Sequence, residues 1–251
     1  MKNLKKVLSL VVVFAMVLSF ASVASASVFP DVSDDSSYAD AINLLYSLKV
    51  VGGDDKGNFN PESTITRAEF AKILFVLMNG TPDATMFTGP SQFDDVSTES
   101  WYIGYINWAS NQNIVGGKGN GMFAPNDPVT VAEATKMFIV ALTGKSTLAW
   151  PYGFISEAYK QNINLFKDAN ITNPDLPAQR QVIAQMAKNA IFATDVANFY
   201  TYGDNGQIAE RGTVATNVFG IKTVVTVLEG TSKDVYNTDI GKTVATQLPN
   251  L

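Results

Sequence analysis

The hydrophobic residues of this chain follow a helical period in pairs of segments, and a polar loop separates the two segments of each pair. In the first pair, apolar side chains recur at three- and four-residue spacing, so they would line one face of each helix. These positions are Tyr38, Ile42, Leu45 and Leu48, followed by Phe70, Ile73, Leu74 and Leu77. Between the segments, Gly52 and Gly53 can adopt a positive φ and are expected to end the first helix. The pattern predicts a helix–loop–helix unit.

The same unit recurs along the chain. An ungapped comparison of residues 29–80 with residues 93–144 gives 20 identities in 52 positions. A weaker third copy aligns Trp101 with Trp150 and Arg67 with Arg180. Because two helices cannot enclose a core alone, we expect the three units to bury their apolar faces against one another. The predicted first, second and third units are residues 27–82, 91–146 and 147–202, the third being degenerate.

The two ends of the chain differ from these units. Three lysines precede a short apolar run, and Ala24-Ser25-Ala26 then has the small-residue pattern that signal peptidase cleaves. Residues 1–26 are therefore predicted to be a signal peptide, with an uncleaved membrane anchor as the alternative. From Val214 to Leu228, β-branched residues alternate and predict a strand or hairpin. Residues 203–251 are expected to form a β-rich tail or the start of a further domain.

Composition narrows the range of functions. The chain has 18 basic and 23 acidic residues, a net charge of −5, and loss of the signal lysines makes it more acidic. This balance disfavours a nucleic-acid partner, which needs a basic surface. The sequence has no cysteine and no histidine, so disulfides, Ser–His–Asp triads and histidine-ligated zinc sites are excluded. We expect no catalytic residues, no metal and no other cofactor, and predict that the chain is not an enzyme.

A family resemblance rests on the order of the short motifs within one unit. The most specific segment is Ile65-Thr66-Arg67-Ala68-Glu69-Phe70, which follows Phe59-Asn60-Pro61. With Phe-x-Asp-Val at the start of the unit and the glycine pair in its loop, this order resembles the S-layer homology domain over about residues 29–200. The resemblance implies a mainly α fold of three helix–loop–helix repeats in a pseudo-threefold arrangement, here followed by the short β-rich segment.

The resemblance also implies a location and a ligand. Three such domains after a signal peptide are typical of the anchoring end of a Gram-positive S-layer protein or surface anchor. Their implied ligand is a secondary cell-wall polysaccharide, often carrying a ketal-linked pyruvate, which is held non-covalently in grooves between neighbouring domains. The predicted location is the cell wall or S-layer, with no membrane contact after signal cleavage, and self-assembly into a surface layer stays open. The alternatives are a surface-attached polysaccharide hydrolase and a scaffold that docks another secreted protein.

Two residue pairs in the repeated motif have the spacing of a capping box. Thr66 with Glu69, and Thr130 with Glu133, can each satisfy two backbone donors at the start of a helix. We therefore interpret both glutamates as structural rather than catalytic. Asp31 and Asp95 precede the short helices of their units, and we interpret them as N-terminal caps or turn residues.

Arg67 is the leading candidate for a ligand contact. The capping box does not use it, and a cation is unfavourable at a helix N-terminus. Its planar guanidinium is suited to a ligand carboxylate, the alternative being a solvated arginine paired with Asp54 or Asp55. The counterpart in the second unit is Val131, so the groove of that unit is expected to lack this contact, with Lys118 as a partial substitute.

Arg180 is the counterpart of Arg67 in the third unit. It is expected to bind more weakly, because Leu165 and Phe166 replace the glycine pair there and Val182 replaces the glutamate. An exposed tryptophan would stack on a sugar, although burial in the core is the interpretation we favour for both tryptophans. The remaining candidate polysaccharide contacts are Gly52, Gly53, Gly116, Gly117, Lys118, Trp101 and Trp150.

Overall fold

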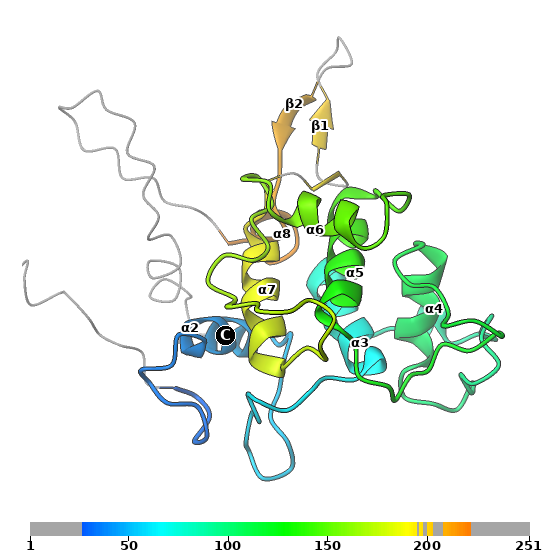
Figure 1. The fold of residues 1–251 in the computed structure, drawn as a ribbon, viewed down its shortest axis with the longest axis horizontal. Coiled ribbons are helices and arrows are strands. Elements are labelled where there is room, and N and C mark those ends of the chain that lie inside the picture. The colour runs from blue at the N-terminus through cyan, green and yellow to red at the C-terminus, as the bar shows by residue number, and fades with distance from the viewer. Residues whose placement is uncertain (1–26, 195, 198–199, 203–207, 222–251) are drawn as a thin grey trace, which may run out of the picture.

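The computed structural model describes residues 27–194, 196–197, 200–202 and 208–221. Within these ranges the chain is mainly helical, as predicted (Figure 1). The α-helices are α2 (Ala39–Ser47), α3 (Arg67–Asn79), α4 (Ile103–Asn111), α5 (Val131–Thr143), α6 (Tyr152–Ala158), α7 (Arg180–Ile191) and α8 (Val214–Asn217), and the 3-10 helix η1 spans Thr85–Phe87. Strands β1 (Tyr200–Tyr202) and β2 (Ile208–Arg211) form an antiparallel pair. The predicted signal peptide, residues 1–26, lies outside the described residues.

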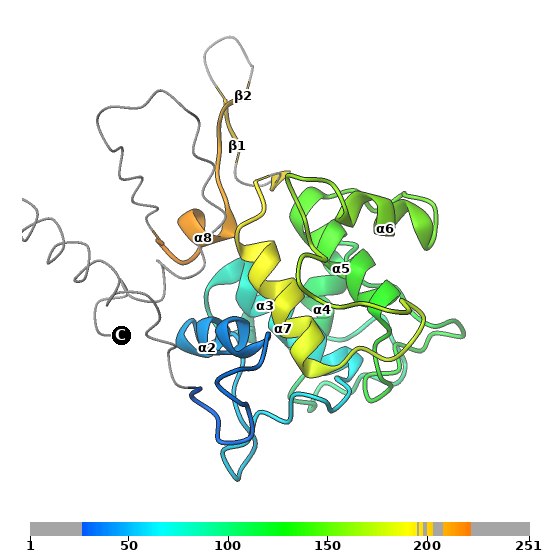
Figure 2. The ribbon, with the colours of Figure 1, turned by 60° about the vertical axis from the view of Figure 1, so that its left-hand side comes forward.

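Each of the three long helices packs on the short helix of another unit. α3 of the first unit packs on α4 of the second, and α5 of the second packs on α6 of the third. α7 of the third unit packs on α2 of the first, so the pairs close into a ring (Figure 2). In the core, the rings of Phe70 from α3 and Phe138 from α5 meet with centroids 5.0 Å apart. The apolar helix faces are therefore buried largely between units.

The long helices also begin against loops of other units. The backbone N–H of Arg67 donates to the carbonyl of Asp127 at 2.9 Å, that of Val131 to Leu176 at 3.1 Å, and that of Arg180 to Ser63 at 2.9 Å. We name each contact after the first residue of its helix. The Arg67 junction joins α3 to the loop before α5 (residues 116–127), the Val131 junction joins α5 to the loop before α7 (residues 165–176), and the Arg180 junction joins α7 to the loop before α3 (residues 52–63).

Two of the three long helices carry caps at both ends. The structure contains the capping boxes of α3 and α5, in which Thr66 and Thr130 accept from the backbone of Glu69 and Glu133. Each of these helices ends on a glycine in the left-handed conformation, Gly80 and Gly144. At the N-terminus of α7, Gln179 makes no side-chain capping bond, and the C-cap is a phenylalanine. The capping motif thus weakens in the same unit in which the sequence repeat weakens.

The glycine pairs of the loops have a different role from the one expected. α2 ends at Ser47, and the residue that turns with a positive φ of 58° is Lys49, so the expectation that Gly52 and Gly53 end this helix is wrong. Gly53 is required by close packing instead, because a Cβ there would lie 2.9 Å from the Phe29 ring. At Gly117 a Cβ would lie 2.7 Å from the carbonyl oxygen of Met122.

Asp31 and Asp95 also act differently from their predicted capping role. The carboxylate of Asp31 accepts hydrogen bonds from the backbone of Phe59 at 2.8 Å and Asn60 at 2.7 Å. The carboxylate of Asp95 accepts from Phe123 and Ala124, both at 2.7 Å. The capping interpretation is therefore wrong, whereas both aspartates do lie in turns before their helices, as the other interpretation required. Each aspartate fixes the loop that follows in its own unit, and periodicity in the sequence carries no signal for such a distant bond.

The segment that follows α7 packs on the helical core. Val214–Asn217 is helix α8, so the strand predicted to begin at Val214 is wrong over these four residues. Thr213 caps this turn, and the buried side chains of Val214 and Ile221 join the core cluster. Their β-branched pattern reflects burial rather than a strand, while residues 222–228 of that prediction lie outside the described residues. In the described part of the chain, no helix has both the length and the apolar character needed to cross a membrane.

Candidate ligand-binding site

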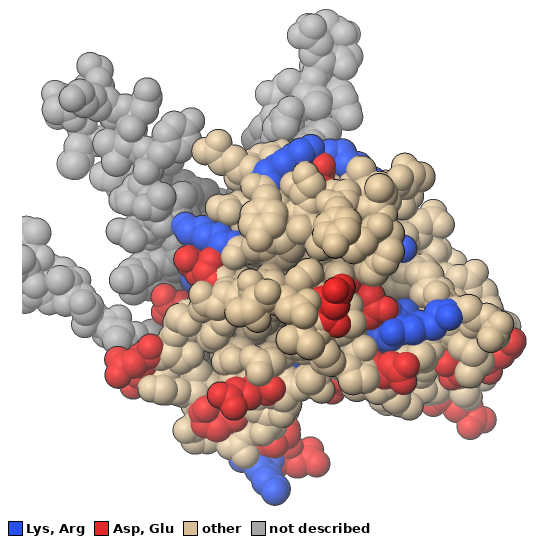
Figure 3. Space-filling view, in the orientation of Figure 1, with Lys and Arg blue, Asp and Glu red and all other residues tan. Residues whose placement is uncertain are grey.

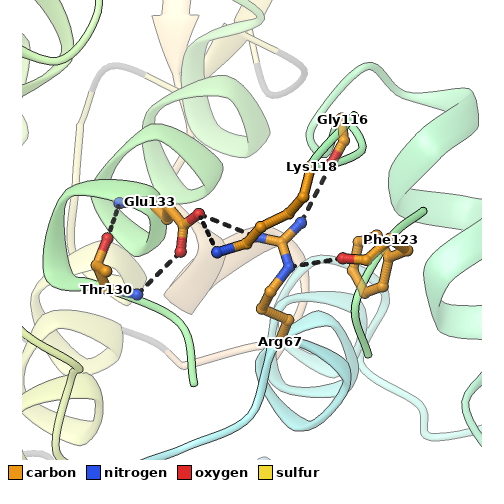
Figure 4. Close-up of polar contacts among 6 residues, drawn as sticks. All are labelled: Arg67, Gly116, Lys118, Phe123, Thr130 and Glu133. Carbon is orange, nitrogen blue, oxygen red and sulfur yellow. Dashed lines mark hydrogen bonds and ion pairs between the residues drawn. The ribbon is translucent and has the colours of Figure 1, made fainter. Parts of the chain in front are cut away.

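The guanidinium of Arg67 lies in the loop of the second unit, not over the loop of its own (Figure 4). Its Nε donates to the carbonyl of Phe123 at 2.9 Å and its Nη2 to the carbonyl of Gly116 at 3.1 Å. The guanidinium carbon lies 4.5 Å from the centroid of the Phe123 ring, a cation–π distance. The side chain is only 5% exposed, so Arg67 is not the solvated arginine that the alternative interpretation required.

Glu133 connects the cap of α5 to this arginine. One carboxylate oxygen accepts from the backbone N–H of Thr130 at 3.0 Å, while the other lies 3.3 Å from Nη1 of Arg67 and 3.1 Å from Nζ of Lys118. Partial burial opposes ionisation, but the bond from Thr130 and the two cations prevail and lower the pKa of Glu133. Arg67 thus pairs with Glu133 rather than with Asp54 or Asp55, and this glutamate does more than cap its helix.

Burial also lowers the pKa of Arg67, and the attraction of Glu133 opposes that effect. A guanidinium starts from so high a value that it stays protonated near neutral pH. The ionised pair is therefore a permanent part of the Arg67 junction across the ordinary pH range. What remains open to a ligand is the side of this junction on which Lys118 lies, with its side chain 37% exposed.

A cleft of about 190 Å³ opens at the Arg67 junction. It is lined by Arg67, Ile114, Val115, Gly116, Gly117, Lys118, Glu133, Lys136, Met137 and Trp150. The lining residues come from all three units, because Trp150 belongs to the third. The sequence reasoning missed Lys136 and Met137 on α5, although Lys136 and Lys72 are identical between the first two units and could have been singled out.

The two matched tryptophans are both exposed, so the favoured prediction that they are buried is wrong. Trp101 is 58% and Trp150 is 55% exposed. Each precedes a short helix that buries other side chains, such as Trp108 on α4 and Phe154 on α6. Nζ of Lys72 lies 5.9 Å from the Trp101 ring, and Trp150 lines the cleft. Both indoles are open to stacking on a sugar ring.

The Arg180 junction repeats the arginine geometry. Nε of Arg180 donates to the carbonyl of Phe59 at 2.8 Å, Nη2 donates to Gly52 at 3.2 Å, and the guanidinium lies 4.8 Å from the Phe59 ring. Burial lowers the pKa of Arg180, and nearby carboxylates, with Glu69 foremost, oppose that shift. The expectation that Arg180 lacks a glycine loop is wrong, because the loop that it contacts belongs to the first unit.

The substitutions that depart from the repeated motif in its arginine, glycine pair and glutamate all lie at the Val131 junction. Val131 stands in place of the arginine, the loop that it meets has Leu165 and Phe166 in place of the glycines, and Val182 stands in place of the glutamate. The expectation that the second unit's own groove lacks an arginine is therefore wrong, since Arg67 of the first unit supplies it. Lys118 accordingly lies beside an arginine and does not substitute for one.

Metal binding has no support among the described residues, where no three acidic side chains lie close enough together to hold an ion. The Arg67 junction instead offers groups that can contact an anion and a flat ring. It combines fixed cations, an exposed indole and backbone groups on glycine, and it contains no pair of free carboxylates placed for acid and base catalysis.

Comparison with known proteins connects this geometry to a family. A model of the S-layer homology domain matches residues 28–71 and residues 92–135, and residues 147–202 lie outside both ranges. The chain is 34% identical over 174 residues to a cell surface protein of Thermoanaerobacter kivui, covering 68% of this chain and 22% of that protein. It is 30% identical over 213 residues to the middle cell wall protein of Brevibacillus brevis, covering 79% of this chain and 20% of that protein.

An exoglucanase of Acetivibrio thermocellus is also similar, at 29% identity over 196 residues, covering 77% of this chain and 16% of that protein. The chain thus spans about a fifth of the length of the cell surface proteins that it matches, and less of the exoglucanase.

Proposed function

Residues 28–71 and 92–135 of this chain are S-layer homology domains, and from this premise we propose that the chain anchors a surface protein by binding a secondary cell-wall polysaccharide non-covalently. The protein is secreted and associated with the cell wall. We further propose that residues 147–202 are a degenerate third repeat and that the three repeats form a pseudo-threefold assembly. The pairing of α7 with α2 and the three equivalent junctions support this arrangement.

The observation that carries the proposed function is the cleft at the Arg67 junction. Three cationic side chains line it, those of Arg67, Lys118 and Lys136, against the single carboxylate of Glu133. An excess of cations in a partly enclosed cleft favours an anionic ligand, because the low local dielectric strengthens the attraction. A ketal-linked pyruvate supplies such a carboxylate on a sugar, so the proposed ligand is a pyruvylated glycan.

The exposed indole of Trp150 completes the proposed recognition. It lies on the rim of the same cleft, and its flat face can cover the apolar C–H face of a pyranose ring. The backbone of Gly116 allows a ring to approach closely, because no side chain projects there. Charge would select the pyruvate, while stacking and backbone approach would hold the sugar that carries it.

Co-sedimentation tests this proposal. Residues 27–251 should pellet with wall sacculi and remain in solution once the secondary polysaccharide has been stripped from them. Soluble polysaccharide should compete for binding, and the same polysaccharide after mild-acid removal of pyruvate should compete at least tenfold less well. Lys118→Ala should weaken binding about tenfold, the worth of a charge-assisted contact.

The matched control is Lys167→Ala, which removes an exposed lysine outside the cleft and should leave binding unchanged. Equal competition by the intact and the pyruvate-free polysaccharides would exclude pyruvate as the recognised group. Equal pelleting with stripped and intact sacculi would exclude the polysaccharide altogether. We propose binding, and not hydrolysis, for these residues.

A further inference from the structure

The loops of the Arg67 and Arg180 junctions have the same backbone hydrogen bond but differ in the charge of one side chain. In the loop before α3, the N–H of Asp54 donates to the carbonyl of Asn58 at 2.8 Å. In the loop before α5, the N–H of Lys118 donates to the carbonyl of Met122 at the same distance. The two side chains therefore leave equivalent points of equivalent loops, and one is an anion where the other is a cation.

Asp54 is an ionised carboxylate fixed within its loop. It accepts hydrogen bonds from Asn60 Nδ2 at 2.9 Å and from the backbone of Lys56 at 2.8 Å and Asn58 at 2.9 Å. The bond from Asn60 is the main cause that lowers its pKa. Asp54 is also among the carboxylates that act on the pKa of Arg180, so it lies within electrostatic range of that guanidinium. Acidic side chains gather over this loop at the bottom of Figure 3.

The loop before α5 lacks the hydrogen bonds that hold Asp54 in the loop before α3. Ala124 stands at the position equivalent to Asn60, so the side-chain partner that would hold an aspartate is gone together with the aspartate. Lys118 turns toward Glu133 and the cleft. The Arg67 junction thus carries Arg67, Lys118 and Lys136 against Glu133, whereas the equivalent positions of the Arg180 junction carry two cations against two carboxylates. Those four residues are Arg180, Lys72, Glu69 and Asp54.

At the Val131 junction only one of the corresponding charges remains, that of the exposed Lys167, which stands at the position equivalent to Lys118. Val131, Leu165 and Val182, which stand at the positions of the arginine, the first loop glycine and the glutamate, are all buried. Buried apolar side chains exclude water and offer no donor to a sugar carboxylate. This junction therefore joins the second and third units, and of the groups found at the Arg67 junction it keeps a single lysine, without the arginine, the glycine backbone or the second lysine.

From these differences we infer that the chain binds its anionic sugar at two unequal sites. The Arg67 junction is the tight site, the Arg180 junction is the weak site, and the Val131 junction binds no sugar. This inference rests on the proposed function and adds to it the number of sites, their order and the residue pair that sets the order, Lys118 and Asp54. A reversal of one charge near the ligand carboxylate separates the two affinities by about tenfold or more.

The test is a calorimetric titration of residues 27–251 with a monosaccharide glycoside that carries a ketal-linked pyruvate. Two binding events per chain are expected, the tighter of which weakens more steeply with added salt. Lys118→Asp should weaken the tight event at least tenfold and leave the weak event unchanged. Asp54→Asn, which removes the charge but keeps an oxygen acceptor for the loop, should strengthen the weak event about threefold to tenfold.

The double variant Lys118→Asp with Asp54→Asn should reverse the order of the two sites. Val131→Ala should leave both events unchanged and serves as the control for the third junction. One event or three events per chain, or a Lys118→Asp variant that keeps the tight event, would overturn the inference while the proposed function stands. No binding by the parent chain would overturn the proposed function, and the inference with it.

Discussion

At the Arg67 junction, a buried guanidinium joins two carbonyl groups, an aromatic ring and a carboxylate of the next unit; at the Val131 junction, a valine begins the equivalent helix. The backbone bonds are nevertheless alike, 2.9 Å from Arg67 to Asp127 and 3.1 Å from Val131 to Leu176. The difference shows that joining neighbouring units and presenting an arginine are separate roles of the repeated motif. Backbone bonds and apolar packing suffice to join neighbouring units, so an arginine at a junction has a further purpose.

Where the arginine is present, its burial has a free-energy cost that its partners must offset. A buried cation must keep its partners, since an unpaired charge in the interior is far more unfavourable than a paired one. At the Arg67 junction the partners are Glu133 and the carbonyls of Gly116 and Phe123. The comparison therefore predicts that the same kind of substitution costs much more stability at the Arg67 junction than at the Val131 junction.

The largest effect is expected from Arg67→Ala. Removing the guanidinium leaves the buried carbonyl of Phe123 without a donor and Glu133 with Lys118 alone, which should lower the free energy of unfolding by about 3 kcal/mol. Urea denaturation of residues 27–251, followed by circular dichroism, measures this change. Val131→Ala at the equivalent helix start should cost about 1 kcal/mol, the loss of a small buried side chain. Equal costs at the two positions would mean that the Arg67 contacts contribute nothing to the junction.

The reverse substitution, Val131→Arg, should destabilise the chain by about 2 kcal/mol. The new guanidinium would be buried against Leu165, and Val182 offers it no carboxylate. Adding Val182→Glu supplies the missing partner and should recover about half of the loss. The same denaturation measurement tests both variants. A single Val131→Arg variant as stable as the parent would show that this junction can accept an arginine without its partner.

The smallest effect concerns pH. Because the pKa of Glu133 is lowered in the folded state, its contribution to stability is present above the pKa of an unfolded glutamate, about 4.3, and is lost as pH falls through the folded value. No histidine titrates between pH 5 and 8. Stability and wall binding should therefore be nearly constant from pH 5 to 8 and decline below about pH 4.5. In Glu133→Gln the part of this decline that comes from Glu133 should vanish. A loss of stability or of wall binding by the parent chain between pH 7.5 and 6 would contradict the assignment.

Much of this architecture follows from the sequence. Hydrophobic periodicity and the repeat located the helix pairs, and the Thr-x-x-Glu spacing located the caps, because both depend on residues near one another in the chain. The exposure of Trp101 and Trp150 did not follow, because both precede their helices, where helical periodicity does not show which side chains face the core. The bonds of Asp31 and Asp95 were hidden for another reason, because their backbone partners lie 28 and 29 residues further along the chain.

The error with the most consequences was the assignment of each arginine to its own unit. A repeat shows which positions are equivalent, but it does not show which copies touch. Arg67 serves the loop of the second unit and Arg180 serves the loop of the first, so both arginines meet glycine-bearing loops. The three departures from the motif, at the arginine, the glycine pair and the glutamate, belong to two units in the sequence but lie together at the Val131 junction.

The contact between α7 and α2 has a mechanical consequence. In an open row of repeats, each terminal repeat is held by one neighbour, and tension on the chain can peel the row apart from its end. Here the first unit touches both the second and the third, so no unit is terminal. A pulling force that acts on one unit is shared between its contacts with two neighbours. The closed ring therefore resists separation of its units better than an open row of three repeats would.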